Sequence, residues 1–469
     1  MGDLRIPARL AVRLCVEVRR AVGLRLPRTS RDSQINHLDW HSVRLLLIAF
    51  YFPPAGGGGV QRTLKFCRDL PDLGVDVDVL APSDPKWFAL DEPLLEAIPA
   101  RTTVHRVRFL GPRSSFRGEA LRGARGLRRA GLHARYAYAR ALVPDKAVPW
   151  GATAVPAAVR IVRKRRIDAI MTTSPPTSVH LVGAAVATAT SKPWVADLRD
   201  SWLAHPHREY ERRGVRAKRA VERRMARTVA HRATALVAVT DAIAAELAGL
   251  DPSAAAKTHV IGHGVDLSDF AGLDHAPPDR FTIVHTGAFF GRRTPRPFLT
   301  AVRDLLDRRP DLRGQVLVRF VGDMRESDRA WARDLGIDGA WEETGFLPYR
   351  DAIAAQRDAD ALLLLIPHAG GRGDTVISGK VYEYLAARRP ILAAVPPNGV
   401  AAALVTSAGA GEVADPDDAA AQSRALEALV DRRRNGGLPD VDLDAGLAES
   451  MSRRERAREL ADVLHGVAG

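Results

Sequence analysis

The chain has 469 residues, well above the usual size of a single domain, so its length predicts two core-forming domains. Its two cysteines, Cys15 and Cys67, exclude a disulfide scaffold and a cysteine-rich metal site and indicate a reducing compartment. The net charge of +14 favours an anionic partner, and no apolar run approaches the roughly 18 residues that a membrane span requires.

Three arginine-rich segments carry the positive charge. Residues 101–140 contain eleven arginines and one glutamate, residues 211–232 contain eight arginines and one lysine against two glutamates, and residues 1–40 contain eight arginines against four acids. Such patches attract anionic lipid, nucleic acid or phosphorylated substrates, and a solvated surface is the alternative for each of them. We take the first two segments as candidate contacts with an anionic membrane. We expect no nucleic-acid partner, because aromatic residues are not interleaved with the arginines.

Residues 1–40 are predicted to form a basic amphipathic extension, with Leu10, Leu14, Val18 and Val22 on one helical stripe. Arginines interrupt its apolar runs, which does not match the layout of a signal peptide. We therefore expect a cytoplasmic protein, with the inner face of the plasma membrane as a candidate location.

Short apolar runs alternate with helical segments in the next part of the chain, which we expect to form one domain over residues 41–264. This alternation predicts a parallel sheet wrapped by helices. The predicted strands are residues 43–50, 75–80, 103–109, 167–172, 193–197 and 235–239. The predicted helices are residues 60–73, 151–166, 178–190 and 208–232.

A linker at residues 265–280 precedes a second alternation, which predicts another domain over residues 281–440. A final helical segment at 441–469 is expected to pack back towards the N-terminal domain. The predicted fold class is α/β, with two Rossmann-like doubly wound domains facing a cleft. The predicted strands are residues 281–286, 316–321, 361–366, 390–394 and 411–413. The predicted helices are residues 295–308, 325–335, 349–358, 379–388, 417–431 and 444–467.

A glycine-rich loop follows the first predicted strand, in the stretch LLLIAFYFPPAGGGGVQR at residues 45–62. Here a backbone without Cβ atoms can approach a ligand closely, and the N-terminus of the following helix favours an anion. The Walker pattern is absent. The dinucleotide fingerprint does not match either, because it requires a glycine at position 61, where this chain has Gln61. The run alone is compatible with a phosphate-approaching loop or with a flexible turn.

The stretch VISGKVYEYLAARRPILAA at residues 376–394 predicts a loop, a helix and a strand. Ser378 and Gly379 stand where the helix begins and backbone N–H groups are free, and Lys380 adds a charge suited to phosphate. Glu383 is the lone acid of this helix and can accept hydrogen bonds from both hydroxyls of a ribose. The alternative for Glu383 is an ion pair with Arg388 or with another basic residue of the surface.

The stretch VHTGAFFGRRTPRPFLTAV at residues 284–302 predicts a strand, a loop and a helix with prolines near its start. The loop contains Gly287, Arg292 and Arg293. Two arginines at such a loop can neutralise a diphosphate and stabilise its departure as a leaving group. The alternative is a solvated loop.

In this order, the three stretches resemble the family 4 glycosyltransferases, which have the GT-B architecture. The likeness covers roughly residues 43–465, and SGKVYEYLAARRPILA, similar to the family's KLFEYLAAGKPVLA pattern, is its most specific match. TTSPP together with DLRDSW looks like the branch that builds surface polysaccharides and glycans. Further matching stretches are DAIMTTSPPTSVHLVG, PWVADLRDSW, VAVTDAIAAEL, VIGHGVDLSDF and EETGFLPYRDAIAAQRDADALLLL.

The resemblance implies a retaining transfer of sugar from a nucleotide-diphosphate sugar to a glycan or lipid-linked acceptor, in cell-envelope polysaccharide biosynthesis. It implies that the C-terminal domain binds most of the donor and the N-terminal domain binds the acceptor. The nucleotide sugar is then a co-substrate, and neither an obligatory metal nor another cofactor is expected.

The family's site residues map onto this chain by position. The implied catalytic cations are Arg292, Arg293 and Lys380, and the implied ribose ligand is Glu383. The other implied donor-binding residues are Gly57, Gly58, Gly287, Phe346, Leu347, Ile377, Ser378 and Gly379.

The candidates for the acceptor side are weaker. Arg199 and Asp200 lie in DLRDSW, which faces the cleft in such a fold. Many family members have a histidine where this chain has Thr173, and His180 lies further on. A histidine on a helix after a loop is more often structural than catalytic.

One departure concerns the donor sugar. Thr375 stands where many members have a glutamate, and the adjacent Asp374 is the substitute candidate. This departure keeps a catalytically idle relative as a competing interpretation. The sequence is also compatible with a non-hydrolysing epimerase of UDP-sugars, which shares the fold, and with a non-catalytic basic protein that binds membrane or nucleic acid.

Overall fold

The structure is a computed structural model that describes residues 42–112, 125–204 and 213–469. The predicted N-terminal extension, residues 1–40, lies outside the described residues. Residues 113–124, within the arginine-rich segment 101–140, lie outside them as well. So do residues 205–212, which overlap the start of the arginine-rich segment 211–232 and of the predicted helix at 208–232.

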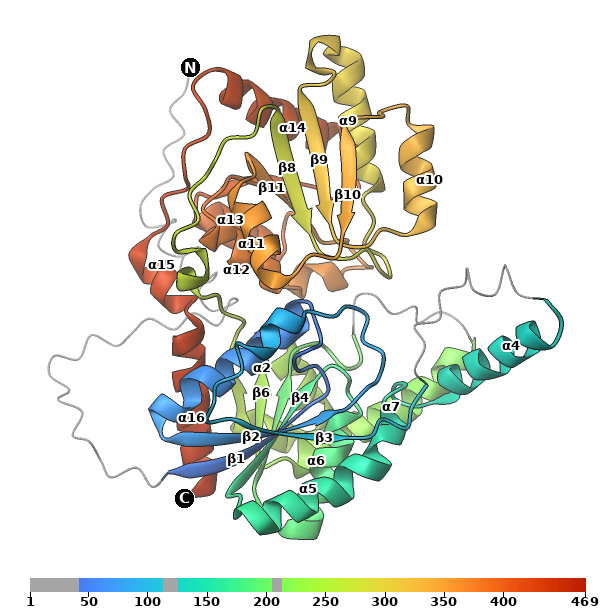
Figure 1. Cartoon of the computed structure of the whole chain (residues 1–469), viewed down its shortest axis with the longest axis vertical. Coiled ribbons are helices and arrows are strands. Elements are labelled where there is room, and N and C mark those ends of the chain that lie inside the picture. The colour runs from blue at the N-terminus through green and yellow to red at the C-terminus, as the bar shows by residue number, and fades with distance from the viewer. Residues whose placement is uncertain (1–41, 113–124, 205–212) are drawn as a thin grey trace, which may run out of the picture. The chain divides into compact units, whose positions relative to one another are not determined.

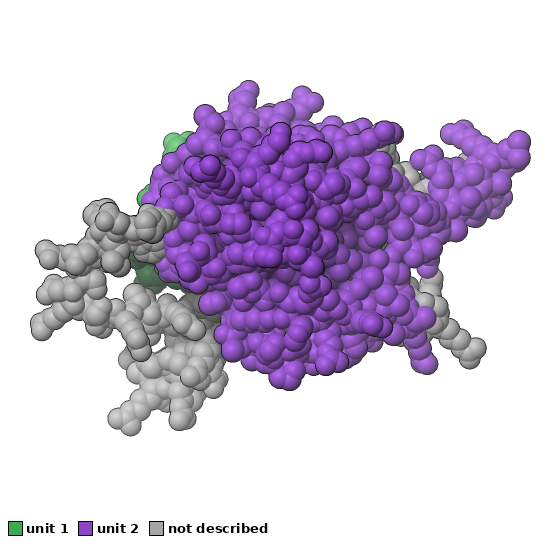
Figure 2. Space-filling model, turned by 90° about the horizontal axis from the view of Figure 1, so that it is seen from below, with its two compact units in different colours: residues 1–27, 205–208, 263–455 green, residues 28–204, 209–262, 456–469 purple. Residues whose placement is uncertain are grey.

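The described chain divides into two compact units (Figure 2). Unit 1 comprises residues 263–455, and unit 2 comprises the described residues up to Gly262 together with residues 456–469. Each unit is built on one all-parallel sheet covered by helices, so the predicted α/β class and the two doubly wound domains are confirmed.

Unit 2 contains a seven-stranded sheet in the order β3-β2-β1-β4-β5-β6-β7 (Figure 1). The order reverses between β1 and β4, and ligands of such sheets bind beyond the carboxyl ends of the strands at this switch point. The strands are β1 (Val43–Ala49), β2 (Val75–Pro82), β3 (Thr103–Val107), β4 (Ala169–Ser174), β5 (Trp194–Leu198), β6 (Ala235–Ala238) and β7 (Thr258–Val260). The main helices are α2 (Gly58–Asp69), α4 (Gly126–Ala141), α5 (Gly151–Arg165), α6 (Val179–Thr190), α7 (Arg213–Arg232), α8 (Asp241–Leu250) and α16 (Arg453–Ala468).

Strand β1 shows why this sheet has two apolar faces. Leu45 and Leu47 point into one core, whereas Leu46 and Ile48 point into the other, because successive side chains alternate across a strand. Helices α2 and α16 cover the first face, and α5, α6, α7 and α8 cover the second. Leu464 shows that the end of α16 belongs to the core of unit 2.

Unit 1 contains a six-stranded sheet in the order β10-β9-β8-β11-β12-β13, with its switch point between β8 and β11. The strands are β8 (Phe281–Thr286), β9 (Val316–Val321), β10 (Trp341–Gly345), β11 (Ala361–Leu365), β12 (Ile391–Ala394) and β13 (Gly411–Ala414). The helices are α9 (Arg296–Arg308), α10 (Glu326–Asp334), α11 (Tyr349–Arg357), α12 (Gly379–Ala386), α13 (Val400–Ser407), α14 (Ala419–Arg434) and α15 (Ala445–Ser450).

The structure differs from the predicted elements where the apolar signal is weak or interrupted. Strands β7 and β10 lie at sheet edges and bury few of their residues, so they lack the apolar run that marks the central strands. The single helix predicted at 444–467 is two helices, because Ser452 forms a β-bridge with Val265 between them. The segment predicted as a linker contains Phe270, which is buried in the core of unit 1.

Candidate functional site

Three neighbouring strands of unit 1 each end at a glycine. Gly287 follows β8, Gly322 follows β9, and Gly345 is the last residue of β10. The backbone N–H of Gly287 donates to the carbonyl oxygen of Val321 at 2.6 Å. A Cβ atom at Gly322 would lie 2.6 Å from the carbonyl carbon of Gly287, so the loops pack backbone against backbone. The ends of β8, β9 and β10, on one side of the switch point, are therefore lined by main chain.

Lys380 lies directly over this glycine-lined edge. A Cβ atom at Gly287, whose φ is +111°, would lie 2.5 Å from Cε and 2.6 Å from Nζ of Lys380. Lys380 is the second residue of α12, and the hydroxyl of the N-cap residue Ser378 accepts a hydrogen bond from its backbone N–H at 3.4 Å. The absence of a side chain at Gly287 thus gives Lys380 its place at the end of β8.

Arg293 is the second cation at this edge. It is 8% exposed, its guanidinium carbon lies 5.4 Å from the centre of the Phe290 ring, and its Nε has no hydrogen-bond partner among the described residues. Burial lowers the pKa of Arg293, and burial together with the charge of Arg293 lowers the pKa of Lys380 to about 7. An anion that binds between two neighbouring cations removes the repulsion by which each disfavours the charge of the other. The neighbouring Arg292 is exposed.

Glu383 lies one helical turn after Lys380 and is held by a network that the sequence did not reveal. Its Oε2 accepts a hydrogen bond from Nε2 of the buried Gln356 at 3.3 Å, and the same Nε2 donates to Oγ1 of Thr286 at 3.2 Å. The backbone N–H of Thr286 donates to the hydroxyl of Tyr384 at 2.9 Å. This network fixes the carboxylate beside the end of β8.

The predicted alternative for Glu383 was an ion pair with Arg388 or with another basic residue of the surface. Nη2 of Arg388 instead lies 3.7 Å from Oδ1 of Asp442. A different arginine, the buried Arg453, interacts electrostatically with Glu383: burial lowers the pKa of Arg453, but Tyr349, Asp266 and Glu383 together raise it. The charge of Glu383 is thus balanced from inside unit 1.

The remaining predicted donor residues occupy three places in unit 1. Phe346 and Leu347 follow β10, where Phe346 is 39% exposed and Leu347 packs against the core. Ile377 is buried immediately before the N-terminus of α12, which begins at Gly379. The substitute candidate Asp374 lies in a short turn after β11 and is half-buried.

A shifted lysine pKa makes anion binding depend on pH. Because the pKa of Lys380 is lowered to about 7 in the free protein, a diphosphate that binds there restores the proton. We therefore expect the affinity for a nucleoside diphosphate to fall by up to roughly tenfold per pH unit above pH 7, with uptake of a proton on binding. Calorimetry at about pH 8 in buffers of different ionisation enthalpy measures that uptake. It should vanish in Lys380→Met, and uptake that is absent in the unmodified chain would contradict this placement of Lys380.

In unit 2, the glycine run forms the start of α2. Gly57 is its N-cap with φ of +90°, and no atom lies within 4 Å of a Cβ built at Gly57, Gly58 or Gly59. Arg199 donates from Nη1 to the carbonyl oxygen of Gly59 at 2.5 Å and from Nε to that of Ser174. The glycines therefore have open space where side chains would stand, and the hydrogen bond from Arg199 to the Gly59 carbonyl holds the run in place.

Arg62 and Asp197 form a buried ion pair beneath this loop, which the sequence did not single out. Nη2 of Arg62 lies 3.1 Å from Oδ1 of Asp197, and Nη1 donates to the carbonyl oxygen of Gly262 at 2.6 Å. Burial alone raises the pKa of Asp197, but Arg62, Arg199 and the hydroxyl of Thr173 bring it below its usual range. Arg62 thereby ties α2 to the ends of β5 and β7.

The acceptor-side candidates have different surroundings. Arg199 is buried, and Asp200 is half-buried beside it. His180 is fully buried on α6, and its Nδ1 lies 2.8 Å from Oγ1 of Thr172, which also accepts from Nε1 of Trp194. Burial lowers the pKa of His180 to about 4, so it is neutral at physiological pH. This environment favours the structural alternative for His180.

The open glycines allow a test that separates ligand approach from folding. Gly58→Ala meets no atom of the chain and improves the helical propensity of α2, so we expect a melting temperature that is not lowered. If the backbone closes on a ligand there, turnover should fall at least about tenfold, since a methyl group enters the contact.

Gly249→Ala is the matched control, because Gly249 is an exposed residue of α8 with the same open surroundings. Unchanged turnover in both variants would show that the glycine run is a flexible turn and does not contact a ligand. Gly57→Ala is unsuitable for this comparison, because its positive φ strains any other residue.

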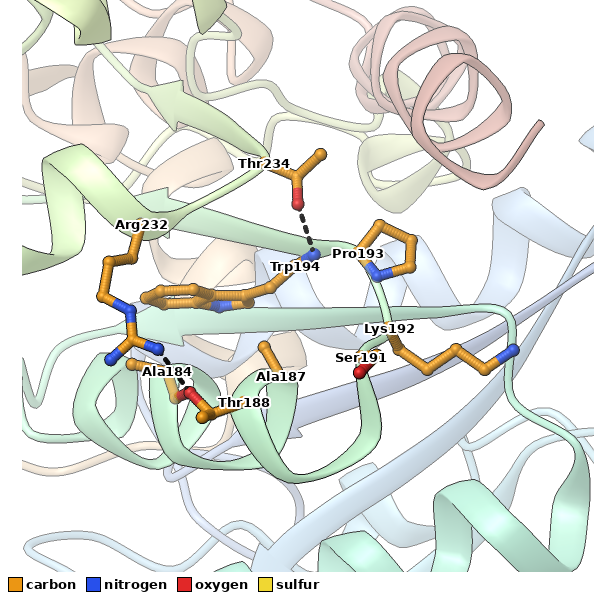
Figure 3. A pocket seen from close by; sticks show the side chains of 9 residues that line it. All are labelled: Ala184, Ala187, Thr188, Ser191, Lys192, Pro193, Trp194, Arg232 and Thr234. Atoms are coloured by element: carbon orange, nitrogen blue, oxygen red, sulfur yellow. Dashed lines mark hydrogen bonds between the residues drawn. The ribbon is translucent and has the colours of Figure 1, made fainter.

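A cavity of about 400 Å³ in unit 2 lies away from these residues (Figure 3). Its walls come from the segments that precede β5 and β6, so it opens at the amino ends of those strands. Nη2 of Arg232 donates to Oγ1 of Thr188 at 2.6 Å, and the backbone N–H of Trp194 donates to Oγ1 of Thr234 at 3.0 Å. No predicted site residue lines it, and ligands of parallel sheets bind at the opposite edge.

One further cluster has the composition of a cation site. His368, Asp415 and Asp417 in unit 1 bring one ligand atom each within 4.8 Å of one another. Nε2 of His368 already lies at hydrogen-bond distance, 2.8 Å, from Oδ2 of Asp415, which accounts for the proximity of these two residues. Within the described segments, no helix combines the length and the apolar character needed to cross a bilayer.

Comparison with known structures confirms the fold. The chain is similar to Anabaena Alr3699/HepE in complex with UDP, with 17% identity and a TM-score of 0.50 over 90% of this chain and 95% of that one. It is also similar to the UDP-GlcNAc 2-epimerase from Methanocaldococcus jannaschii, with 11% identity and a TM-score of 0.50 over 89% and 99%. The shared two-sheet architecture is therefore that of GT-B proteins.

Sequence comparison finds glycosyltransferases that are similar to part of the chain. A D-inositol 3-phosphate glycosyltransferase from Nocardioides sp. is 31% identical over 127 residues, which are 24% of this chain and 28% of that protein. The chain thus spans less than a third of that relative's length. The model of the glycosyl transferase 4-like domain matches residues 57–264, which include the glycine run, Arg62, Asp197 and Arg199. Residues 57–264 are therefore similar to the glycosyl transferase 4-like domain.

Proposed function

We propose that this protein transfers a sugar from a nucleotide-diphosphate sugar to an acceptor hydroxyl. The observation that carries the proposal is a pair of cations, the buried Arg293 and the half-buried Lys380, beside the fixed carboxylate of Glu383 at the switch point of unit 1. Cations suit a diphosphate, and a carboxylate suits the two hydroxyls of a ribose. The three groups together match a nucleoside diphosphate.

The proposed reaction retains the anomeric configuration. The bond between the anomeric carbon and the diphosphate oxygen breaks first, and its electron pair leaves with the diphosphate. Lys380 and Arg293 stabilise the charge that develops on this leaving group. The acceptor oxygen then bonds to the anomeric carbon on the same face, and the departing phosphate takes the acceptor's proton. No metal enters this scheme, so activity should survive a chelator.

Three features suggest the substrates and the location. UDP is the first nucleotide to test, since a neighbour of the same fold was solved with it. The curated relative's name gives D-inositol 3-phosphate as its acceptor, so phosphorylated polyols belong in an acceptor screen beside glycans and lipid-linked sugars. The segment similar to the polysaccharide branch of the family supports a role in cell-envelope synthesis at the inner face of the membrane.

A nucleotide-sugar epimerase is the second candidate, because one neighbour of the same fold is named as such an enzyme. Both candidates need a nucleoside diphosphate site, so its geometry alone does not separate them. The KVYEYLAARRPILA segment, with Lys380 and Glu383 on one helix, favours transfer.

The experiment is a thermal-shift screen of nucleoside diphosphates and their sugars, followed by product analysis. A bound nucleotide at about 100 times its Kd raises stability by about 2.7 kcal/mol, which gives a measurable shift. A shift with one nucleotide and a new glycoside in the presence of acceptor support the proposal. An epimerised donor formed without acceptor would favour the epimerase, and the absence of any shift would contradict both.

A further inference from the structure

Helix α4 of unit 2 has an unusual environment. None of its 16 residues, Gly126–Ala141, is buried, and it extends away from the sheet of its unit (Figure 1). It is held near its C-terminal end, where Nζ of Lys218 on α7 donates to the carbonyl oxygen of Leu142 at 3.0 Å. A surface helix of a globular protein normally buries one apolar stripe. This helix therefore has an apolar face that nothing in the described chain covers.

The uncovered face is a continuous stripe at helical spacing. Leu127 is 94% exposed and Tyr138 is 51% exposed, and both lie on it. The residues between them recur every three or four positions, which places them on one side of a helix. The stripe consists of Leu127, Ala130, Gly131, Ala134, Ala137, Tyr138 and Ala141, all of them exposed.

Positive charge borders this stripe on both sides. Residues 125–141 contain five arginines and one histidine and no acidic residue. At 100° per residue, Arg128 and Arg135 fall along one border, and His133 and Arg140 fall along the other. A helix with an apolar stripe between basic borders lies in the plane of a lipid interface, with the stripe at the acyl boundary and the cations at the headgroups.

We propose that α4 docks unit 2 onto an anionic lipid bilayer through this stripe, hereafter the α4 stripe. Charge selects the occupant: two copies of this chain that paired their stripes would bring the arginine borders together, whereas anionic headgroups neutralise them. The inference goes beyond the proposed transferase activity, since it would hold even if the chain transferred no sugar.

The test is sedimentation of the full chain with vesicles. Phosphatidylcholine vesicles that contain phosphatidylglycerol should bind it, and phosphatidylcholine alone should bind it weakly. Arg128→Glu/Arg135→Glu should weaken binding by roughly 30-fold or more, since each basic group near an anionic surface contributes about a factor of five. Leu127→Asp/Tyr138→Asp should weaken it at least tenfold, because the apolar insertion is lost.

The control is Arg424→Glu/Arg432→Glu, which makes the same charge change at two exposed positions of α14 in unit 1 and should leave binding unchanged. Melting temperatures of both α4 variants should match the unmodified chain, because no residue of α4 is buried. Unaltered vesicle binding in the Leu127→Asp/Tyr138→Asp variant would overturn the proposal. Two other results would also overturn it. One is a dimer of the unmodified chain, seen by light scattering, that the Leu127→Asp/Tyr138→Asp variant dissociates. The other is binding of the unmodified chain to nucleic acid but not to vesicles.

Discussion

Replacing Lys380 with methionine is expected to lower turnover by about 100-fold or more while leaving the protein as stable as before or more so. The side chain lies over Gly287 at the end of β8, where it faces the proposed leaving group. Methionine has about the volume of lysine but carries no charge. It therefore removes an ammonium group whose pKa is lowered to about 7 by burial and by the charge of Arg293. Loss of activity without loss of stability would show that the charge serves the reaction and not the fold.

Arginine variants sharpen this test, since the sequence left two arginines as candidates. Arg293 is buried at the same edge and Arg292 is exposed. We expect Arg293→Met to lose about as much turnover as Lys380→Met, and Arg292→Met to lose only a few-fold, because exposed charges are screened. Steady-state kinetics with a defined donor, beside thermal melts, measure both effects. Near-normal turnover in both Lys380→Met and Arg293→Met would contradict the assigned leaving-group site.

Replacing Glu383 with glutamine is expected to weaken nucleotide binding by about 10- to 100-fold, because hydrogen bonds to a charged acceptor contribute about 1.5–3 kcal/mol. The carboxylate is fixed by Gln356, which also holds Thr286 at the end of β8. Calorimetry with UDP measures the effect. The loss should shrink to a few-fold when the nucleotide lacks both ribose hydroxyls, since the variant and the analogue then remove the same contact.

Another glutamate of the same unit provides the control for this comparison of variant and nucleotide analogue. Glu412 lies on β13, away from the switch point, and Glu412→Gln should bind UDP as the unmodified chain does. If Glu383→Gln loses as much affinity for the dideoxy nucleotide as for UDP, the carboxylate has a structural role and does not hold the ribose.

The sequence predicted the two sheets well because central parallel strands are continuous apolar runs. Strand β11, with the sequence ALLLL, is buried throughout and was placed within one residue. Strand β10, with the sequence WEETG, is partly exposed and polar, so its pairing with β9 was not visible. Helix α4 was missed for a related reason, since its apolar stripe is made mostly of alanines.

The sequence also indicated the chemical groups of the site without their supports. Local spacing placed Lys380 and Glu383 one turn apart, because both lie on one helix. Gln356 belongs to another helix, and its contacts with Thr286 and Glu383 span 70 and 27 residues of sequence. Arg62 meets Asp197 across 135 residues. Such contacts depend on the order of the strands, which the periodicity of a sequence does not contain.

A crystal structure of the chain with UDP bound would test the central claim most directly. The account predicts the diphosphate within hydrogen-bond distance of Nζ of Lys380 and the guanidinium of Arg293, with the ribose hydroxyls on Glu383. UDP held by other side chains, with these three left free, would contradict it.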